Sequence, residues 1–220
     1  LRPLDVPHSE EIVTIAAETK GDETGGFQYS FSIDALKDFQ ARADPFSAVV
    51  GVMPRIGGLA SGGQAFQFWF AAVSDNFFTG LGVTPGAGKL FTVRSGSPVH
   101  VVIGHTFWMK TFGGDPDVIG RAVRIDGVPA IVTGVVSQSF RGPFMGVELD
   151  GYITLDDLGV ITPDVNRWLY HNRKARTLQF FGRMKPGVRV SEAQAAMDVL
   201  MTTLETEHPE SDRAIGAIVL

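Results

Sequence analysis

A strand–helix–strand pattern occurs near each end of the chain, and this repetition constrains the fold more than any other feature of the sequence. The first third predicts three strands, over residues 11–17, 46–53 and 64–74. A helix over 32–43 has apolar residues three to four positions apart, and Ser32 is expected to cap it. The Gly-rich stretch 54–63 is expected to be a turn or the tip of a hairpin.

The last third of the chain repeats part of this pattern. A strand over 177–184 precedes an alanine-rich helix, which Ser191 is expected to cap with Glu192 in its first turn. Pro209 ends that helix, and a closing strand covers 214–220. Because sequential strand–helix units tend to pair in space, the two ends are expected to form one unit with the middle inserted between them.

The middle of the chain has a different texture, with short strands and several Gly and Pro residues. Strands over 121–125 and 128–135 flank Asp126-Gly127, a pair that favours a type I′ hairpin turn. The run Gly113-Gly114-Asp115-Pro116 is expected to end a helix over 106–112 and to start a new helical turn. These elements indicate a second, smaller α+β unit.

The sequence therefore predicts an α+β fold with two subdomains. The first is discontinuous, with β-α-β units from 1–74 and 176–220, and the second is a mixed α+β subdomain inserted over 75–175. A chain of 220 residues buries enough surface to fold without disulfides or metal.

Composition excludes several classes of function. The formal net charge is −5 and no basic block is present, which argues against a nucleic-acid partner. Cysteine is absent, so zinc-thiolate sites, Cys nucleophiles and iron–sulfur clusters are excluded. The chain has 16 Phe but only 3 Tyr and 5 His, so it is rich in packing residues and poor in catalytic ones.

The ends of the chain carry no targeting signal. Leu1–Leu4 precedes no apolar stretch of a signal peptide, and no run approaches the ~18 apolar residues of a membrane helix. The chain does not begin with Met and stops in apolar residues, so both ends are expected to continue into a longer polypeptide.

Catalytic and metal-binding motifs are lacking. The stretch Gly82–Leu90 resembles a phosphate loop but has five residues between its first Gly and Gly88-Lys89, and Leu90 stands where Ser or Thr would bind magnesium. No Ser lies in a Gly-x-Ser-x-Gly elbow. No metal-binding spacing relates the five histidines, which are His8, His100, His105, His171 and His208. We predict no catalytic, cofactor-binding or metal-binding residue.

Two weaker groupings have simpler explanations than chemistry. The carboxylate pairs Asp115/Asp117 and Asp156-Asp157 lie in expected turns, where Asp is common. A basic cluster could hold a phosphate or an anionic lipid headgroup, although a solvated face is favoured. Its members, with two interleaved aromatic residues, are Arg167, Trp168, Tyr170, His171, Arg173, Lys174 and Arg176.

A set of short motifs, in order along the chain, resembles a known family. The motifs are Leu1-Arg2-Pro3-Leu4; Val73–Phe78; Leu81-Gly82-Val83-x-Pro85; Gly88-Lys89-x-Phe91; Phe107-Trp108; Phe112–Gly120; Val123–Gly127; Val132–Val136; Phe140-Arg141-Gly142; and Phe181–Val188. Together they resemble the periplasmic core domain of MacB-type and FtsX-like ABC transporter permeases. Lys89 stands where the family usually has Arg, and Gly104-His105 replaces a small polar pair.

The resemblance implies a fold, a location and a function. It implies a porter-like subdomain made from both ends of the chain and an inserted Sabre-like subdomain. It implies a position outside the cytoplasmic membrane, between the first two membrane helices of a permease. It also implies packing roles for Phe77, Phe78, Trp108, Phe112 and Phe140, and turn roles for Gly82, Gly88, Gly114, Gly120 and Gly127.

We therefore expect a non-catalytic extracytoplasmic domain of an inner-membrane efflux or lipoprotein-release permease, which transmits conformational change and contacts substrate or partner proteins. The expected partners are the rest of the permease, a cytoplasmic ATPase subunit and a periplasmic protein, with homodimer formation left open and no nucleic acid or cofactor. The alternatives are a free-standing periplasmic hydrolase and a lipid- or peptide-binding protein.

Overall fold

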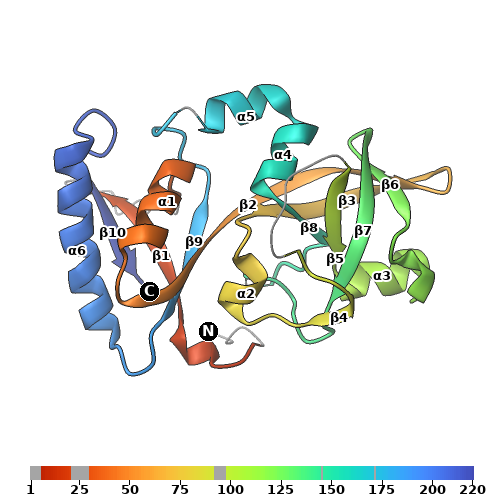
Figure 1. Ribbon diagram of the computed structural model, residues 1–220, viewed down its shortest axis with the longest axis horizontal. Helices are drawn as coiled ribbons and strands as arrows, with labels where there is room; N and C mark the ends of the chain where they lie inside the picture. Colours follow the sequence, from red (N-terminus) through yellow and green to blue (C-terminus); the bar gives the residue numbers. More distant parts are fainter. Residues whose placement is uncertain (1–5, 21–29, 92–97, 145, 171) are drawn as a thin grey trace. The chain divides into compact units, whose positions relative to one another are not determined.

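The computed structural model describes residues 6–20, 30–91, 98–144, 146–170 and 172–220 (Figure 1). The chain divides into two compact units. Unit 1 comprises residues 1–9 and 53–166, and unit 2 comprises residues 10–52 and 167–220. Each unit thus draws on separate stretches of sequence. The predicted insert over 75–175 shares most of its residues with unit 1, but the limits differ because unit 1 begins at Met53. That the two units are separately folding subdomains stays a prediction.

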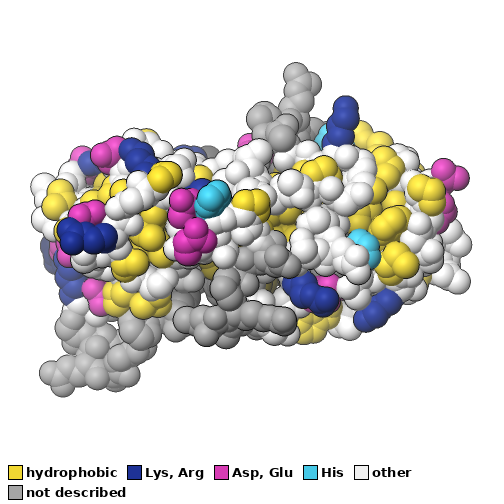
Figure 2. Space-filling view, turned by 90° about the horizontal axis from the view of Figure 1, so that it is seen from below, with side chains coloured by type: hydrophobic (Ala, Val, Ile, Leu, Met, Phe, Trp, Pro, Cys, Tyr) yellow, Lys and Arg dark blue, Asp and Glu magenta, His cyan; other side chains and the backbone are white. Residues whose placement is uncertain are grey.

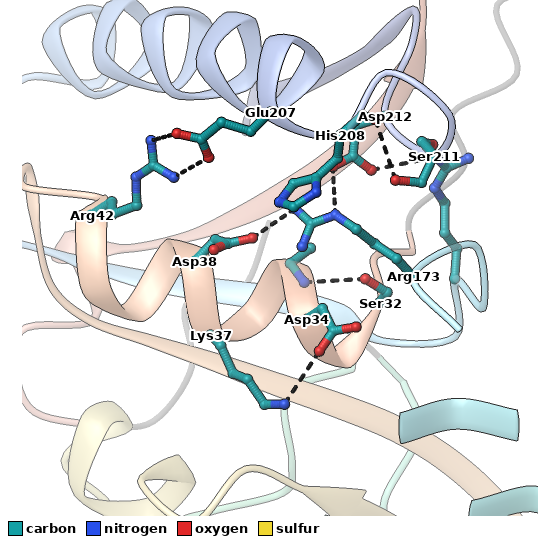
Figure 3. Close-up of polar contacts among 12 residues, drawn as sticks. Ser32, Asp34, Lys37, Asp38, Arg42, Arg173, Glu207, His208, Ser211 and Asp212 are labelled. Carbon is teal, nitrogen blue, oxygen red and sulfur yellow. Dashed lines mark hydrogen bonds and ion pairs between the residues drawn. The ribbon is translucent and has the colours of Figure 1, made fainter. Parts of the chain in front are cut away.

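Unit 2 is an antiparallel sheet with two helices. Its strand order is β10-β1-β9-β2, and every pairing is antiparallel. The strands are β1 Ile12–Thr19, β2 Phe46–Ser61, β9 Gln179–Met184 and β10 Ile215–Val219, and the helices are α1 Ile33–Arg42 and α6 Val190–Glu207. Arg42 at the end of α1 forms an ion pair with Glu207 at the end of α6 at 2.7 Å, and the two helices lie side by side (Figure 3).

The N-terminal ends of α1 and α6 can be compared with the caps predicted at Ser32 and Ser191. The Ser32 hydroxyl accepts a hydrogen bond from the Ala35 backbone N–H at 3.1 Å, which confirms it as the cap of α1. The predicted cap at Ser191 is wrong, because α6 begins at Val190 after Arg189. The Glu192 carboxylate accepts a bond from the Arg189 backbone N–H at 3.1 Å, which starts the helix two residues earlier than a Ser191 cap would.

The outer edge of unit 2 is protected by one side chain. Among the described strands, β10 pairs on one side only, with β1. On the other side, the Gln194 amide of α6 donates to the Ala217 carbonyl at 2.8 Å and accepts from the Val219 backbone N–H at 2.9 Å. The side chain thus occupies the positions that a further strand would take.

We expect Gln194→Ala to increase self-association, because it exposes an unpaired strand edge. The matched control is Thr202→Ala, which removes an exposed hydroxyl that bonds only within α6. Sedimentation velocity over a concentration series measures the effect. A Gln194→Ala variant that stays as monodisperse as the Thr202→Ala control contradicts the protective role.

Unit 1 is built on six strands whose pairings close into a ring. The order is β2-β3-β8-β5-β7-β6, and β6 pairs back onto β2 through Leu59–Ile125 and Ala60–Arg124. A seventh strand, β4, pairs with β7. The strands are β3 Gln64–Val73, β4 Pro85–Gly88, β5 Val99–Ile103, β6 Ala122–Ile125, β7 Val128–Val136 and β8 Gly151–Thr154.

Short helices connect these strands. They are α2 Phe77–Leu81, α3 His105–Phe112, α4 Leu155–Ile161 and α5 Pro163–Tyr170, with 3₁₀ turns η1 at Ser9–Glu11 and η2 at Pro116–Val118 (Figure 1). The expected Asp-Gly hairpin is confirmed, since Asp126 (φ 48°) and Gly127 (φ 84°) join β6 to β7. The helix stop is confirmed too: Gly113 has φ 63° after α3, and Asp115 accepts a bond from the Asp117 N–H.

A hairpin tip does lie in the stretch 54–63, but its predicted extent is wrong, because β2 continues to Ser61 and the turn is formed by Gly62-Gly63. The glycine at 57 makes room for the hairpin turn of β6 and β7. A Cβ at Gly57 would lie 2.6 Å from a carboxylate oxygen of Asp126. The Gly58 N–H donates to that carboxylate at 2.7 Å, and the Gly58 carbonyl accepts from the Asp126 N–H at 2.9 Å.

Phenylalanine rings fill the core of unit 1. Phe77, Phe78 and Phe140 are buried around Tyr152, with ring centroids 5.1 to 6.2 Å apart. The packing role holds less fully for Trp108 and Phe112, which are only half-buried. Burial raises the pKa of the Tyr152 phenol. The five glycines with implied turn roles all adopt positive φ.

We expect Phe77→Ala to lower the free energy of unfolding by about 3–5 kcal/mol, because the ring is fully buried. Trp108→Ala removes a half-buried ring and should destabilise less. Urea unfolding followed by circular dichroism compares the two. Equal midpoints for the wild-type chain and Phe77→Ala would mean that Phe77 is not a core residue.

Candidate functional site

The residues considered for chemistry do not come together. Within the described ranges, no group of three or more His, Asp or Glu side chains could hold a metal ion. The stretch Gly82–Leu90, which resembles a phosphate loop, begins directly after α2 and contains β4, so it is a turn only in part. That catalytic, cofactor and metal residues are lacking remains a prediction.

Two members of the basic cluster, Arg173 and Arg176, do not belong to a solvated face. Arg173 is 14% exposed and pairs with Asp38 and Asp212. Arg176 donates to the Ser211 carbonyl. Both guanidinium groups are therefore occupied within the protein and do not point outward as free anion ligands. His171 and the Arg167 side chain lie outside the described residues.

A shallow pocket of about 420 Å³ lies in unit 1. Its lining has three hydroxyl side chains and no ionisable one; the residues are Val6, Pro7, Gly82, Val83, Thr84, Ser137 and Ser139. Such a lining offers no general acid, base or metal ligand of the His or carboxylate type.

The most distinctive surface of unit 1 is one face of the β2–β3 hairpin. Side chains alternate across a strand, and on one face Leu59, Phe68 and Phe70 are buried. The opposite face, which we call the hairpin outer face, has no charged side chain. It consists of Pro54, Ile56, Gly58, Ala60, Ala65, Gln67 and Trp69.

Two large apolar side chains lie opposite each other on the hairpin outer face. The two-residue turn at Gly62-Gly63 has φ 57° and 79°, which places Ser61 opposite Gln64 and hence Ile56 opposite Trp69. Both are exposed, Ile56 at 59% and Trp69 at 43%. The Trp69 backbone points toward β8, so this is a non-hydrogen-bonded pair, in which side chains lie closest.

Asp150 fixes the backbone of Trp69 from the side of β8. Its carboxylate accepts a hydrogen bond from the Trp69 N–H at 2.8 Å, and its own N–H donates to the Trp69 carbonyl at 2.6 Å. Burial raises the pKa of the Asp150 carboxyl, while the bond from Trp69 acts in the opposite direction. The backbone N–H and carbonyl of Trp69 are therefore both hydrogen-bonded on the side of β8, while its indole is exposed.

Sequence reasoning missed the hairpin outer face because it took all of 54–63 for a turn or the tip of a hairpin. The signal was nonetheless present. From Pro54 to Ala60 and from Ala65 to Trp69, every second residue is uncharged, and Gly62-Gly63 between them is a strong two-residue hairpin turn.

Charge is dispersed on one face of the molecule. The face in Figure 2 carries Lys and Arg side chains scattered among acidic and hydrophobic ones. In the described part of the chain, no helix is long and apolar enough to cross a membrane.

Comparison with solved structures identifies the fold. The structure is similar over 98% of this chain and 92% of the other to a domain assigned to a permease protein from Porphyromonas gingivalis, with TM-score 0.70 and 14% identity. It is similar to the extracellular domain of the ABC-type transporter YknZ from Gram-positive bacteria, with TM-score 0.65, 13% identity and coverage of 94% and 99%. For the periplasmic region of MacB from Actinobacillus actinomycetemcomitans the values are 0.63, 15%, 97% and 92%.

Comparison with sequences identifies the family. A search of curated proteins finds no match. The family model described as the MacB-like periplasmic core domain matches residues 3–200, which is most of the chain. This agrees with the ordered motifs and with the α+β fold. The chain therefore belongs to the MacB-like periplasmic core domain family, and it is an extracytoplasmic domain of an ABC transporter permease.

Proposed function

We propose that this domain performs no chemistry and acts by contact: the hairpin outer face binds a partner protein, and the domain passes conformational change between that partner and the rest of the permease. The ATP-hydrolysing subunit that drives the change is proposed to be a separate cytoplasmic protein. The observation that carries the proposal is the exposed, uncharged pair Ile56 and Trp69 on a paired strand ladder.

The energetics of the hairpin outer face suit protein contact. Trp and Ile together expose apolar area that water contacts unfavourably, and Trp is the residue type most enriched in binding hot spots. Two charged residues border this face. Asp150 accepts a hydrogen bond from the Trp69 N–H at 2.8 Å, and Arg124, opposite Ala60, donates to the Gly127 carbonyl at 2.7 Å. A partner therefore meets an uncharged centre and has charged groups to desolvate only at these two margins.

A hydrolase is less well supported. It would need a His within hydrogen-bond reach of a carboxylate and a Ser inside a pocket. The pocket of unit 1 contains Ser137 and Ser139, but its lining has no His and no carboxylate. Family membership also favours a permease domain over a free-standing enzyme.

We expect a photo-crosslinking amino acid at position 67 of the intact permease to form an adduct with another protein in cells. Gln67 lies at the centre of the hairpin outer face. The matched position is Val199, which is 68% exposed on α6 in unit 2. Mass spectrometry of the adducts identifies the partner.

The double variant Ile56→Ser/Trp69→Ser should abolish the position-67 adduct and leave any position-199 adduct unchanged. A position-67 adduct that survives the double variant, or equal adducts from both positions, would overturn the proposed contact. Adducts with lipid, or a lipid that co-purifies with this chain, would favour the binding-protein alternative.

A further inference from the structure

The chain passes between its two units three times, and each passage lies inside a regular element. The passages fall between residues 9 and 10, 52 and 53, and 166 and 167. These positions lie within η1, within β2 and within α5. A hydrogen-bonded element is stiffer than a Gly- or Ser-rich linker, so a displacement along it is not absorbed by loose chain.

The third passage lies in α5, and the segment 172–176 that follows α5 is bound to the rest of unit 2 through side chains. After α5, the backbone N–H groups of Lys174, Ala175 and Arg176 all bond within the segment itself. Pairing with another segment begins only at Thr177 and Leu178, whose N–H groups reach the Phe31 carbonyl. Between α5 and that point, Ala175 is buried, and the side chains of Arg173 and Arg176 form hydrogen bonds with the rest of unit 2.

Arg173 is bound by two carboxylates from different parts of unit 2 (Figure 3). Its Nε donates to Asp212 Oδ2 at 2.7 Å and its Nη2 to Asp38 Oδ2 at 2.6 Å. Asp38 lies on α1, and Asp212 lies in the turn after α6. The side chains of Arg173 and Asp212 are only 14% and 8% exposed.

Charge and geometry hold Arg173 to Asp38 and Asp212. Burial lowers the pKa of the Arg173 guanidinium, but the bonds to Asp212 and Asp38 outweigh it, so the pKa is raised and the group stays charged. Taking Arg173 away would leave two carboxylates close together and partly buried, without their shared cation. The two bonds use separate N–H groups of one planar fork, a geometry that Lys cannot reproduce.

We propose that Arg173 is the positioning residue that fixes the end of α5 to α1 and to the turn after α6, so that movement of α5 reaches both helices of unit 2. The proposal rests on the proposed function, because it assigns the route by which the domain passes conformational change. It concerns contacts inside unit 2, whereas the partner contact lies on unit 1.

Amide hydrogen exchange of the intact permease, with its ATPase and in lipid nanodiscs, tests the anchor. We expect Arg173→Lys to speed exchange of peptides covering 172–178 and 208–213 at least tenfold. The matched control is Arg189→Lys, which alters an exposed ion pair with Glu192 on the same unit. Unchanged exchange in Arg173→Lys overturns the anchor.

A triple variant guards against loss of folding. Asp38→Asn/Arg173→Met/Asp212→Asn removes all three charges, so neither carboxylate is left without Arg173. Arg176, which lies 4.0 Å from Asp212, keeps its hydrogen bond to the Ser211 carbonyl. We expect it to fold and to keep the fast exchange of 172–178. Wild-type exchange in the triple variant would show that the ionic contacts do not hold the segment.

Transmission is tested by trapping the ATPase with ATP and vanadate. In the wild-type permease, we expect trapping to change the exchange of α5, α1 and α6. In the triple variant, the change should persist in α5 and be lost from α1 and α6. A response retained in α1 and α6 overturns the route through Arg173. No response anywhere in the wild-type domain instead refutes the transmission that the proposed function assumes, whatever the anchor does.

Discussion

The closure of six strands into a ring is the constraint on which unit 1 depends. It requires the β6–β7 turn to approach β2 near its C-terminal end, and the contact is made by Asp126 with the backbone of Gly58. A side chain at Gly57 would collide with the same carboxylate. Each ring strand has a neighbour on both sides, and β6 closes the ring onto β2 at Leu59 and Ala60, next to the exposed face of the β2–β3 hairpin.

In unit 2, polar side chains cover the strand edge and connect distant segments. Its sheet does have an outer edge at β10, which the Gln194 amide covers, and its returning segment is held by Arg173. A single side chain such as Gln194 covers a strand edge only where it can reach the backbone groups of that edge. Ring closure, in contrast, depends on the pairing of all six strands. The two units therefore have different weak points: a glycine in unit 1, and a Gln or an Arg in unit 2.

Local patterns in the sequence predicted most elements, and distant contacts explain what they missed. The cap at Ser32, the Asp126-Gly127 hairpin and the stop at Gly113 depend on neighbours within four residues, so the sequence alone predicts them. The strand through 54–61 could not be predicted from its glycines, because their partner Asp126 is 68 positions away. The pairing of Arg173 with Asp38 joins residues 135 positions apart and leaves no local pattern. Ordered motifs identified the family because they sample the whole chain.

The excess of phenylalanine takes on a specific meaning in this fold. Rings of Phe31, Phe39 and Phe180 pack in unit 2, and those around Tyr152 pack in unit 1, so aromatic clusters fill both cores. Close-packed rings resist compression, which lets each unit move as a body instead of deforming. In the proposed transmission, the connecting elements carry displacement from one unit to the other, and loose connections would absorb it. The passages lie inside η1, β2 and α5, and Arg173 follows the last of them.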